Sequence, residues 1–201
     1  MGKKLGNPHK HRYKYGKQTS PIDFQTFRDI MEEGEKQNKF VSLLRDKSFL
    51  AFLYWFGVRR AEALERVKED FKIKDGLLIV DATPKKGGER EPLEIPVGYP
   101  YVDLIIEQVD KTRRTLGNPT KRVWDMSPQT AWRIAKRVMP KHYPHYFRLN
   151  RATRFLEDPN TTIPEMIAWF GWKVSKTVDP YIGYSRRHIR RQRQRLRREL
   201  E

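Results

Sequence analysis

The sequence predicts a mostly α-helical domain with one small three-stranded antiparallel sheet. Apolar residues recur at helical spacing along most of the chain. Residues 71–96 are the exception, because β-branched residues alternate there and tight-turn sequences interrupt them. The length of 201 residues suits one domain with appendages better than two independent cores.

The first helix is expected to begin near residue 20. Ser20 is a suitable N-cap and Pro21 fits a first helical turn. An apolar stripe follows, which consists of Ile22, Phe27, Ile30 and Met31. We therefore expect ordered structure to start at this point.

Residues 39–57, "KFVSLLRDKSFLAFLYWFG", form the most apolar segment of the chain. Phe49, Phe52, Leu53 and Phe56 recur at helical spacing, and Gly57 follows as a helix-ending residue. This pattern predicts a buried central helix that ends at Gly57.

Three short strands are expected in residues 71–96, with turns at Asp75-Gly76 and Lys86-Gly87-Gly88. The pattern is helical again from residue 101 onward. Ser127-Pro128 and Thr162-Ile163-Pro164 are further helix-start signals.

The chain carries 42 Lys and Arg against 25 Asp and Glu, a net charge of +17, which predicts a polyanionic partner. Residues 1–18 and residues 186–201 each contribute +6. We expect a mobile basic tail over 1–18, one ordered domain over 19–185 and a basic helix over 186–201. The expected DNA-binding residues in these two ends are Lys10, Arg12, Lys14, Arg186, Arg187, Arg190 and Arg191.

Several kinds of chemistry lack the residues they need. The absence of cysteine excludes disulfides, thiolate zinc sites and cysteine nucleophiles. The sequence has no Gly-rich phosphate loop and no histidine cluster with metal-ligand spacing. We therefore expect neither a metal nor another cofactor. No apolar run is long enough to cross a bilayer or to form a signal peptide, so no membrane partner and an intracellular location are expected.

Phosphodiester cleavage without a metal needs a nucleophile, cations at the non-bridging oxygens and an acid for the leaving alkoxide. Arginine suits the second role because its planar fork binds two phosphate oxygens. Arg59 follows the apolar helix and lies three residues before Glu62, with which it could simply form an ion pair. His145 and Arg148 are also three residues apart, so on a helix they would share a face.

These segments resemble the motifs of the tyrosine recombinase, or phage integrase, family. "GVRRAEAL" resembles the family's G-x-R-x-x-E-L box, and "HYFRLNRAT" resembles its H-x-L-R-H-x-x-A-T box. "TPKKGGEREPLEIP" resembles the K-x-x-x-x-R-x-x-P hairpin, and "FGWKVSKTVDPYIGYS" resembles the box that ends in the nucleophilic tyrosine. The four motifs occur in the family's order across about residues 40 to 185. The resemblance implies the catalytic-domain fold of this family.

The resemblance also implies a role for each matching residue. Arg59 and Arg148 would hold the scissile phosphate, with Glu62 in support, and His145 would assist proton transfer. Trp172 would pack against the phosphate, and Lys85 would protonate the leaving 5′ oxygen. Lys86 is the alternative to Lys85, because hairpin turns vary in length.

The nucleophile is expected at Tyr181, ten residues after Gly171, and Tyr184 is the alternative one turn further on. A free phenol has a pKa near ~10, so it needs neighbouring cations and a proton acceptor to react at neutral pH. The arginines and His145 would supply both.

The resemblance predicts a site-specific recombinase or integrase that forms a 3′-phosphotyrosyl intermediate on double-stranded DNA. The alternatives are a type IB topoisomerase and a basic DNA-binding protein that keeps the fold without catalysis. We further expect a homo-oligomer on DNA, from dimer to tetramer. We also expect the chain to belong to a mobile element, virus or plasmid of a prokaryotic host. The charged, cysteine-free composition would suit a thermophile. Leu149 and Asn150 depart from the second box, which indicates a divergent branch. Only a short basic stretch precedes the catalytic helices here, so the expectation is either a minimal or truncated enzyme or one in which residues 1–18 hold the duplex.

Overall fold

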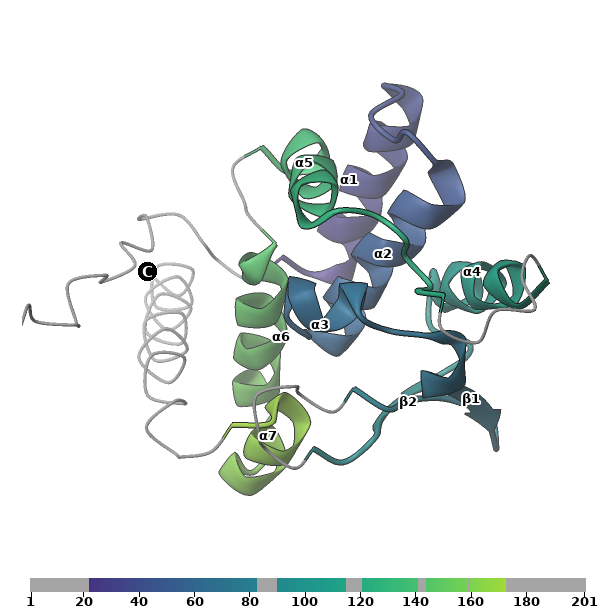
Figure 1. Cartoon of the computed structure of the whole chain (residues 1–201). Coiled ribbons are helices and arrows are strands. Elements are labelled where there is room, and N and C mark those ends of the chain that lie inside the picture. Colours follow the sequence, from purple (N-terminus) through teal and green to yellow (C-terminus); the bar gives the residue numbers. More distant parts are fainter. Residues whose placement is uncertain (1–21, 83–89, 115–120, 141–143, 159, 173–201) are drawn as a thin grey trace, which may run out of the picture.

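The structure is a computed structural model that describes residues 22–82, 90–114, 121–140, 144–158 and 160–172. The predicted basic tail, the predicted C-terminal helix and both predicted domain boundaries lie outside these residues. Within them, the protein is mostly helical and has one three-stranded antiparallel sheet, as the sequence predicts (Figure 1).

Helix α2 (Leu43–Phe56) lies at the centre of the fold. Every residue from Ser48 to Phe56 is buried, because α4 (Val102–Arg114) and α6 (His145–Glu157) pack against this helix. Gly57 ends it in the left-handed conformation, with φ of 61°, and its N–H donates to the carbonyl of Leu53. The predicted central helix and its last residue are therefore confirmed.

Helix α1 (Phe24–Lys36) begins later than predicted. Its N-cap is Asp23, whose side chain accepts a hydrogen bond from the backbone N–H of Thr26. This hydrogen bond lowers the pKa of Asp23, which shows that the cap favours the ionised carboxylate. The prediction of Ser20 as the cap was wrong, since the carboxylate three residues further on satisfies the first free N–H groups.

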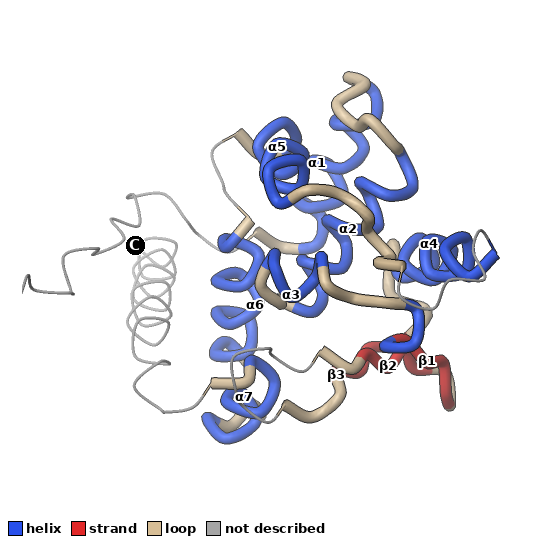
Figure 2. The backbone as a smooth tube through the Cα atoms, viewed as in Figure 1, coloured by secondary structure: helices blue, strands red, loops and turns tan. Residues whose placement is uncertain are grey.

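The sheet has the order β1 (Phe71–Lys74), β2 (Leu77–Val80) and β3 (Leu93–Pro96) (Figure 2). The turn between the first two strands is at Asp75-Gly76, as predicted, and both residues have positive φ. Leu78 pairs with Ile95, and Val80 pairs with Phe71 and Leu93. These five side chains face the core and are buried. The predicted turn at Lys86-Gly87-Gly88 lies outside the described residues.

Two further helices begin where the sequence predicts. Ser127 caps α5 (Pro128–Val138), and Thr162 caps α7 (Ile163–Phe170) in a capping box with Glu165. Helix α5 packs on α1 and on the short helix α3 (Arg60–Leu64), and a 3₁₀ turn (Lys68–Asp70) leads into the sheet. In Figure 1, α7 lies below α6, and Arg148 of α6 contacts both Glu62 of α3 and Phe170 of α7.

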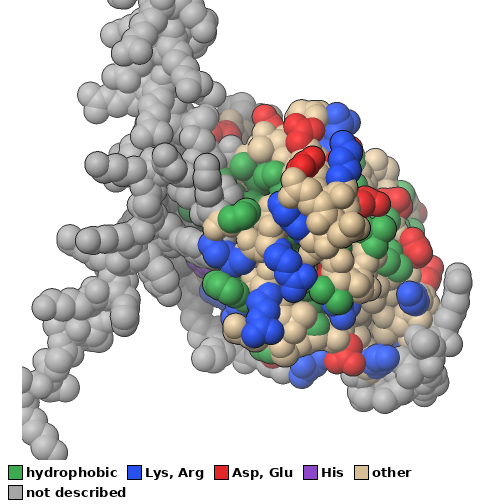
Figure 3. All heavy atoms as spheres, turned by 90° about the horizontal axis from the view of Figure 1, so that it is seen from above, with side chains coloured by type: hydrophobic (Ala, Val, Ile, Leu, Met, Phe, Trp, Pro, Cys, Tyr) green, Lys and Arg blue, Asp and Glu red, His purple; other side chains and the backbone are tan. Residues whose placement is uncertain are grey.

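The surface carries both signs of charge. Seen from above, Lys and Arg side chains run across the middle of the molecule, while Asp and Glu lie mostly towards its edges (Figure 3). On α5, Arg133 and Arg137 point outward, whereas Ala131, Ile134 and Val138 are buried. None of the described helices has the length and apolar character needed to cross a membrane.

Candidate active site

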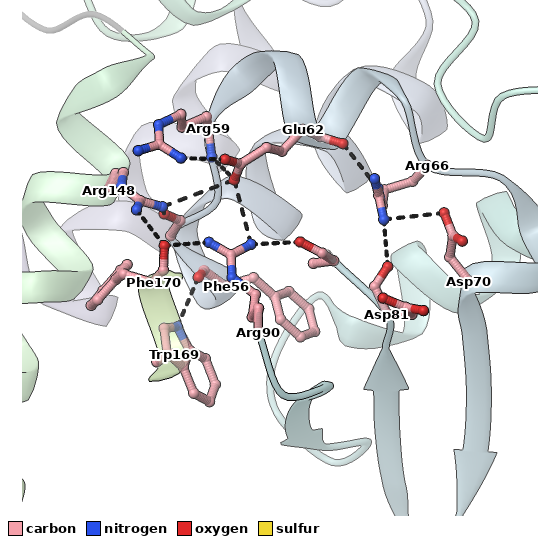
Figure 4. A network of polar contacts seen from close by, with 12 residues as sticks. Phe56, Arg59, Glu62, Arg66, Asp70, Asp81, Arg90, Arg148, Trp169 and Phe170 are labelled. Carbon is pink, nitrogen blue, oxygen red and sulfur yellow. Dashed lines mark hydrogen bonds and ion pairs between the residues drawn. The ribbon is translucent and has the colours of Figure 1, made fainter. Parts of the chain in front are cut away.

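Glu62 is the centre of a polar cluster formed by α3, α6, the end of α7 and the start of β3 (Figure 4). Its side chain is 8% exposed and lies among three arginines. Its Oε1 is 2.5 Å from Nη1 of Arg59, and its Oε2 is 3.4 Å from Nη1 of Arg90 and 3.9 Å from Nη1 of Arg148. One carboxylate therefore holds guanidinium groups from three separate segments.

Arg59 is the exposed member of this arginine cluster. It is the N-cap of α3, directly after the Gly57-Val58 turn, and its backbone N–H donates to Oε2 of Glu62 at 2.9 Å. Its side chain is 47% exposed although Nη1 contacts the carboxylate. The ion pair that the spacing of Arg59 and Glu62 allows is present, and the side chain of Arg59 still faces solvent over much of its surface.

Arg148 lies beneath this surface, and its side chain is only 1% exposed. Its Nη1 donates to the carbonyl of Gly57 at 3.1 Å, and its Nη2 donates to the carbonyl of Phe170 at 2.7 Å. The guanidinium also lies over the rings of Phe170 and Trp172, 4.9 and 5.7 Å from their centroids. Trp172 stacks on Phe170 at 4.7 Å. The structure thus brings Arg148 and Trp172 together.

Arg90, for which no role was predicted, completes the cluster. Its side chain is fully buried. Besides Glu62, it binds the carbonyls of Ala82 and Phe170, at 2.8 and 2.7 Å. The signal was present in the sequence as the arginine of the K-x-x-x-x-R pattern, but its carbonyl partners are backbone groups that no motif displays.

Among the described residues, the cluster contains more positive than negative charge. Burial by itself would raise the pKa of Glu62, but hydrogen bonds from Arg59 and the charges of Arg90 and Arg148 hold that pKa below its ordinary value. Glu62 is therefore an anion that balances one of its three arginines. The excess charge is exposed at Arg59, so an anion is favoured there.

His145 is the first residue of α6 and is partly buried. Burial lowers the pKa of its imidazole, and the charges of Arg148 and Arg59 lower it further. The ring is therefore neutral at neutral pH and can accept a proton. His145 lies three residues before Arg148 on α6, so the two side chains share a face of that helix.

The remaining predicted residues lie outside the described part of the chain. These are Lys85 and its alternative Lys86, Tyr181 and its alternative Tyr184, and the basic residues Lys10, Arg12, Lys14, Arg186, Arg187, Arg190 and Arg191. Their roles stay predictions.

The two departures from the second arginine box have structural reasons. Leu149 is 5% exposed and belongs to the apolar core. Asn150 is also buried, and its Oδ1 accepts a hydrogen bond from the backbone N–H of Ile22 at 2.8 Å. Asn150 therefore fixes the chain just before α1 against α6.

Several solved structures share this fold. The XerH site-specific recombinase bound to difH substrate in a pre-cleavage complex matches with a TM-score of 0.66 and 13% identity, over 82% of this chain and 50% of that chain. XerH bound to palindromic difH substrate in a post-cleavage complex matches with a TM-score of 0.67 and 14% identity, over 86% and 52%. The XerA recombinase matches with a TM-score of 0.61 and 14% identity, over 90% and 66%.

The chain therefore has the fold of a tyrosine recombinase catalytic domain. It spans between 50% and 66% of the length of these three proteins. No family model and no curated protein matches it in sequence.

Proposed function

We propose that this chain is the catalytic domain of a DNA recombinase that breaks and rejoins strands through a 3′-phosphotyrosyl intermediate. The observation that supports the proposal is that Arg59 and Arg148 both contact the carboxylate of Glu62, with Trp172 against Arg148 and His145 three residues before Arg148 on α6. This site lies in a fold that the chain shares with site-specific recombinases, two of whose structures are named as complexes with their substrate.

The arginines would stabilise the charge that develops on the scissile phosphate. Arg59 supplies an exposed guanidinium, and its Glu62 contact orients the side chain without neutralising the whole cluster. Arg148 adds positive potential from a buried position, and its guanidinium packs on the indole of Trp172. Such fixed charges need no reorganisation when the phosphate becomes pentacoordinate.

The proposed reaction exchanges one phosphodiester for another. The phenol oxygen of Tyr181 forms a bond to phosphorus, and the bond from phosphorus to the 5′ oxygen breaks. His145, being neutral, accepts the phenol proton, and Lys85 gives a proton to the leaving 5′ oxygen. The products are a 3′-phosphotyrosyl ester and a 5′-hydroxyl. Attack by a 5′-hydroxyl of a partner strand reverses these steps, so no external energy source is consumed.

Double-stranded DNA is the proposed partner, and the net charge of +17 supports it. We propose that residues 1–18 and 186–201 contact the DNA backbone on either side of a catalytic domain over residues 19–185. Assembly into dimers or tetramers on DNA is part of the same proposal, because strand exchange needs a second duplex.

The test is to trap the covalent intermediate on nicked duplexes in EDTA and to separate it on a denaturing gel. A pool of random and host-derived duplexes replaces the unknown target site. Wild type, Tyr181→Phe and Tyr184→Phe are compared, with DNA binding measured in parallel.

An adduct that disappears only with Tyr181→Phe supports the proposal as stated. Loss only with Tyr184→Phe moves the nucleophile one turn along the chain. Binding without any adduct across the pool would contradict the proposal and favour a non-catalytic DNA-binding protein. Relaxation of supercoiled DNA without strand exchange would favour a type IB topoisomerase.

A further inference from the structure

Arg90 occupies a position that links three segments of the site. It directly follows residues 83–89 and precedes β3, and its side chain has no solvent exposure. A fully buried arginine is unusual, since removing the charge from water is costly unless partners surround it. The identity of its partners therefore indicates what the residue does.

The guanidinium of Arg90 donates hydrogen bonds to three separate segments of the chain (Figure 4). Nη1 reaches the carboxylate of Glu62 on α3 and the carbonyl of Ala82 after β2. Nη2 reaches the carbonyl of Phe170, the last residue of α7. The three partners are 28, 8 and 80 residues away in sequence.

We propose that Arg90 is a positioning residue that sets the relative placement of the catalytic groups without contacting the DNA. Its catalytic consequence rests on the recombinase function proposed above. Through Glu62 it acts on Arg59, and through Phe170 it acts on Arg148 and on Trp172 two residues later. Ala82 and Arg90 also flank residues 83–89, which include the predicted Lys85.

The carbonyl of Phe170 is the point where the two buried arginines meet. It accepts from Nη2 of Arg90 and from Nη2 of Arg148, both at 2.7 Å. A carbonyl at the C-terminal end of a helix has no partner within the helix and carries partial negative charge, so two guanidinium groups satisfy it well. The position of α7 is thereby fixed against both α6 and the start of β3.

Only arginine has the geometry for this arrangement. Its rigid planar fork presents several N–H donors in fixed directions, so it can bind Glu62, Ala82 and Phe170 at the same time. The ammonium of lysine is a compact charge that cannot span the same three acceptors. Methionine keeps much of the apolar volume of the side chain but removes every hydrogen bond.

Arg66 provides a matched control in the same region. Its side chain is 9% exposed; its Nε binds the backbone carbonyl of Glu62 at 3.0 Å, and its Nη1 binds that of Asp81. It thus joins α3 to the end of β2 as Arg90 does. Among the described residues it contacts neither Phe170 nor the carboxylate of Glu62, so it should support the fold without placing α7.

The first measurement is hydrogen exchange, which does not depend on activity. Full-length wild type, Arg90→Met, Arg90→Lys and Arg66→Met are compared by mass spectrometry of peptides that contain Glu62, Ala82 or Phe170. Arg90→Met should speed exchange in all three peptides, and Arg90→Lys should do so to a lesser degree. Arg66→Met should speed exchange near Glu62 and Ala82 and leave the Phe170 peptide unchanged.

The second measurement is the rate of covalent adduct formation at saturating protein, with DNA affinity measured in parallel. We expect Arg90→Met to slow the step roughly 10- to 100-fold with little change in affinity, as for residues that orient catalytic groups from behind. Arg90→Lys should restore part of the rate. Arg66→Met should remain close to wild type once both proteins are compared well below their unfolding temperatures.

The outcomes separate the two proposals. If wild type forms no adduct, the recombinase proposal fails, and hydrogen exchange still decides whether Arg90 places α7. If hydrogen exchange in the Phe170 peptide is the same in Arg90→Met as in wild type, the positioning role is overturned, whether or not wild type forms an adduct. If wild type forms the adduct, the positioning role is also overturned when Arg90→Met forms it as fast as wild type or Arg66→Met does.

Discussion

The apolar core around α2 and the arginine cluster around Glu62 lie next to each other and are built on opposite principles. In the core, the ring centroid of Phe52 lies 4.6 Å from that of Trp124 and 4.8 Å from that of Phe56, and both pairs of rings are tilted. Such contacts depend on volume and tolerate small changes of direction. In the arginine cluster, each guanidinium group meets a particular carboxylate or carbonyl oxygen. Stability therefore depends on shape in the apolar core, and on charge and hydrogen-bond direction in the arginine cluster.

The largest expected effect comes from Glu62→Gln, which keeps the shape of the side chain but removes its charge. Three arginine groups would then lack their shared anion, and two of them are buried. We expect the free energy of unfolding to fall by about 3 kcal/mol. Urea denaturation followed by circular dichroism measures this change.

The matched control for Glu62→Gln is Leu50→Met in the apolar core, where the residue is fully buried. This substitution also conserves volume, and it should cost less than about 1.5 kcal/mol. Equal losses for the two variants would contradict the distinction between the regions.

Gly57→Ala should have the next largest effect, because Gly57 joins the two regions. It ends α2 with φ of 61°, and its carbonyl accepts from Arg148. An added Cβ would lie 2.7 Å from Cβ of Arg151 and 3.0 Å from Cε1 of Phe170. We expect a loss of about 2 kcal/mol or more from conformation and overlap together. Thermal unfolding at matched pH would show it, and an unchanged midpoint would disprove the close approach.

Arg151→Met should have a smaller effect of the opposite sign. Arg151 stacks on Phe155 and Trp169 at 4.8 and 5.2 Å, but its Nε is buried without a hydrogen-bond partner among the described residues. Burial lowers the pKa of Arg151 to about 10. Methionine would keep an aromatic contact and remove the buried Nε that lacks a partner, so we expect stability to rise by about 1 kcal/mol. A clear loss in the same denaturation assay would show that the charge stabilises the fold.

The smallest expected effect is the pH dependence that His145 contributes. Its folded pKa lies below the ordinary value of 6.5, so the folded state binds fewer protons than the unfolded state. Its contribution to stability is therefore complete above pH 6.5 and is lost as the pH falls through the lowered pKa of the folded state. Adduct formation should decline over the same range. His145→Gln should remove this dependence, and a decline that persists in the variant would assign it to another group.

Much of the fold could be predicted from the sequence, because apolar periodicity and turn residues act locally. The burial of Phe49 and Phe52, the cap at Ser127 and the turn at Asp75 all follow from neighbours within a few residues. The start of α1 was missed because the Ser20-Pro21 signal is purely local, whereas the folded chain uses the carboxylate of Asp23 as the cap.

The candidate site was less accessible from the sequence. Motif spacing identified Arg59, Glu62 and Arg148, and the structure places them in one cluster. The role of Arg90 could not be read in the same way, since two of its partners are backbone carbonyls that every residue possesses. The burial of Arg148 was equally hidden, as a motif gives the identity of a side chain but not its depth.

The central claim is a covalent bond between a tyrosine and the 3′ side of the cleaved strand. The most direct test uses nicked duplexes labelled at the 5′ end of the cleaved strand, incubated with the full-length protein in EDTA, followed by peptide mapping of the labelled protein. The account predicts that the label moves to a peptide containing Tyr181, and that the other product carries a 5′-hydroxyl that polynucleotide kinase can phosphorylate directly. Label transfer only from the opposite end, or a 5′-phosphate on the released strand, would contradict it.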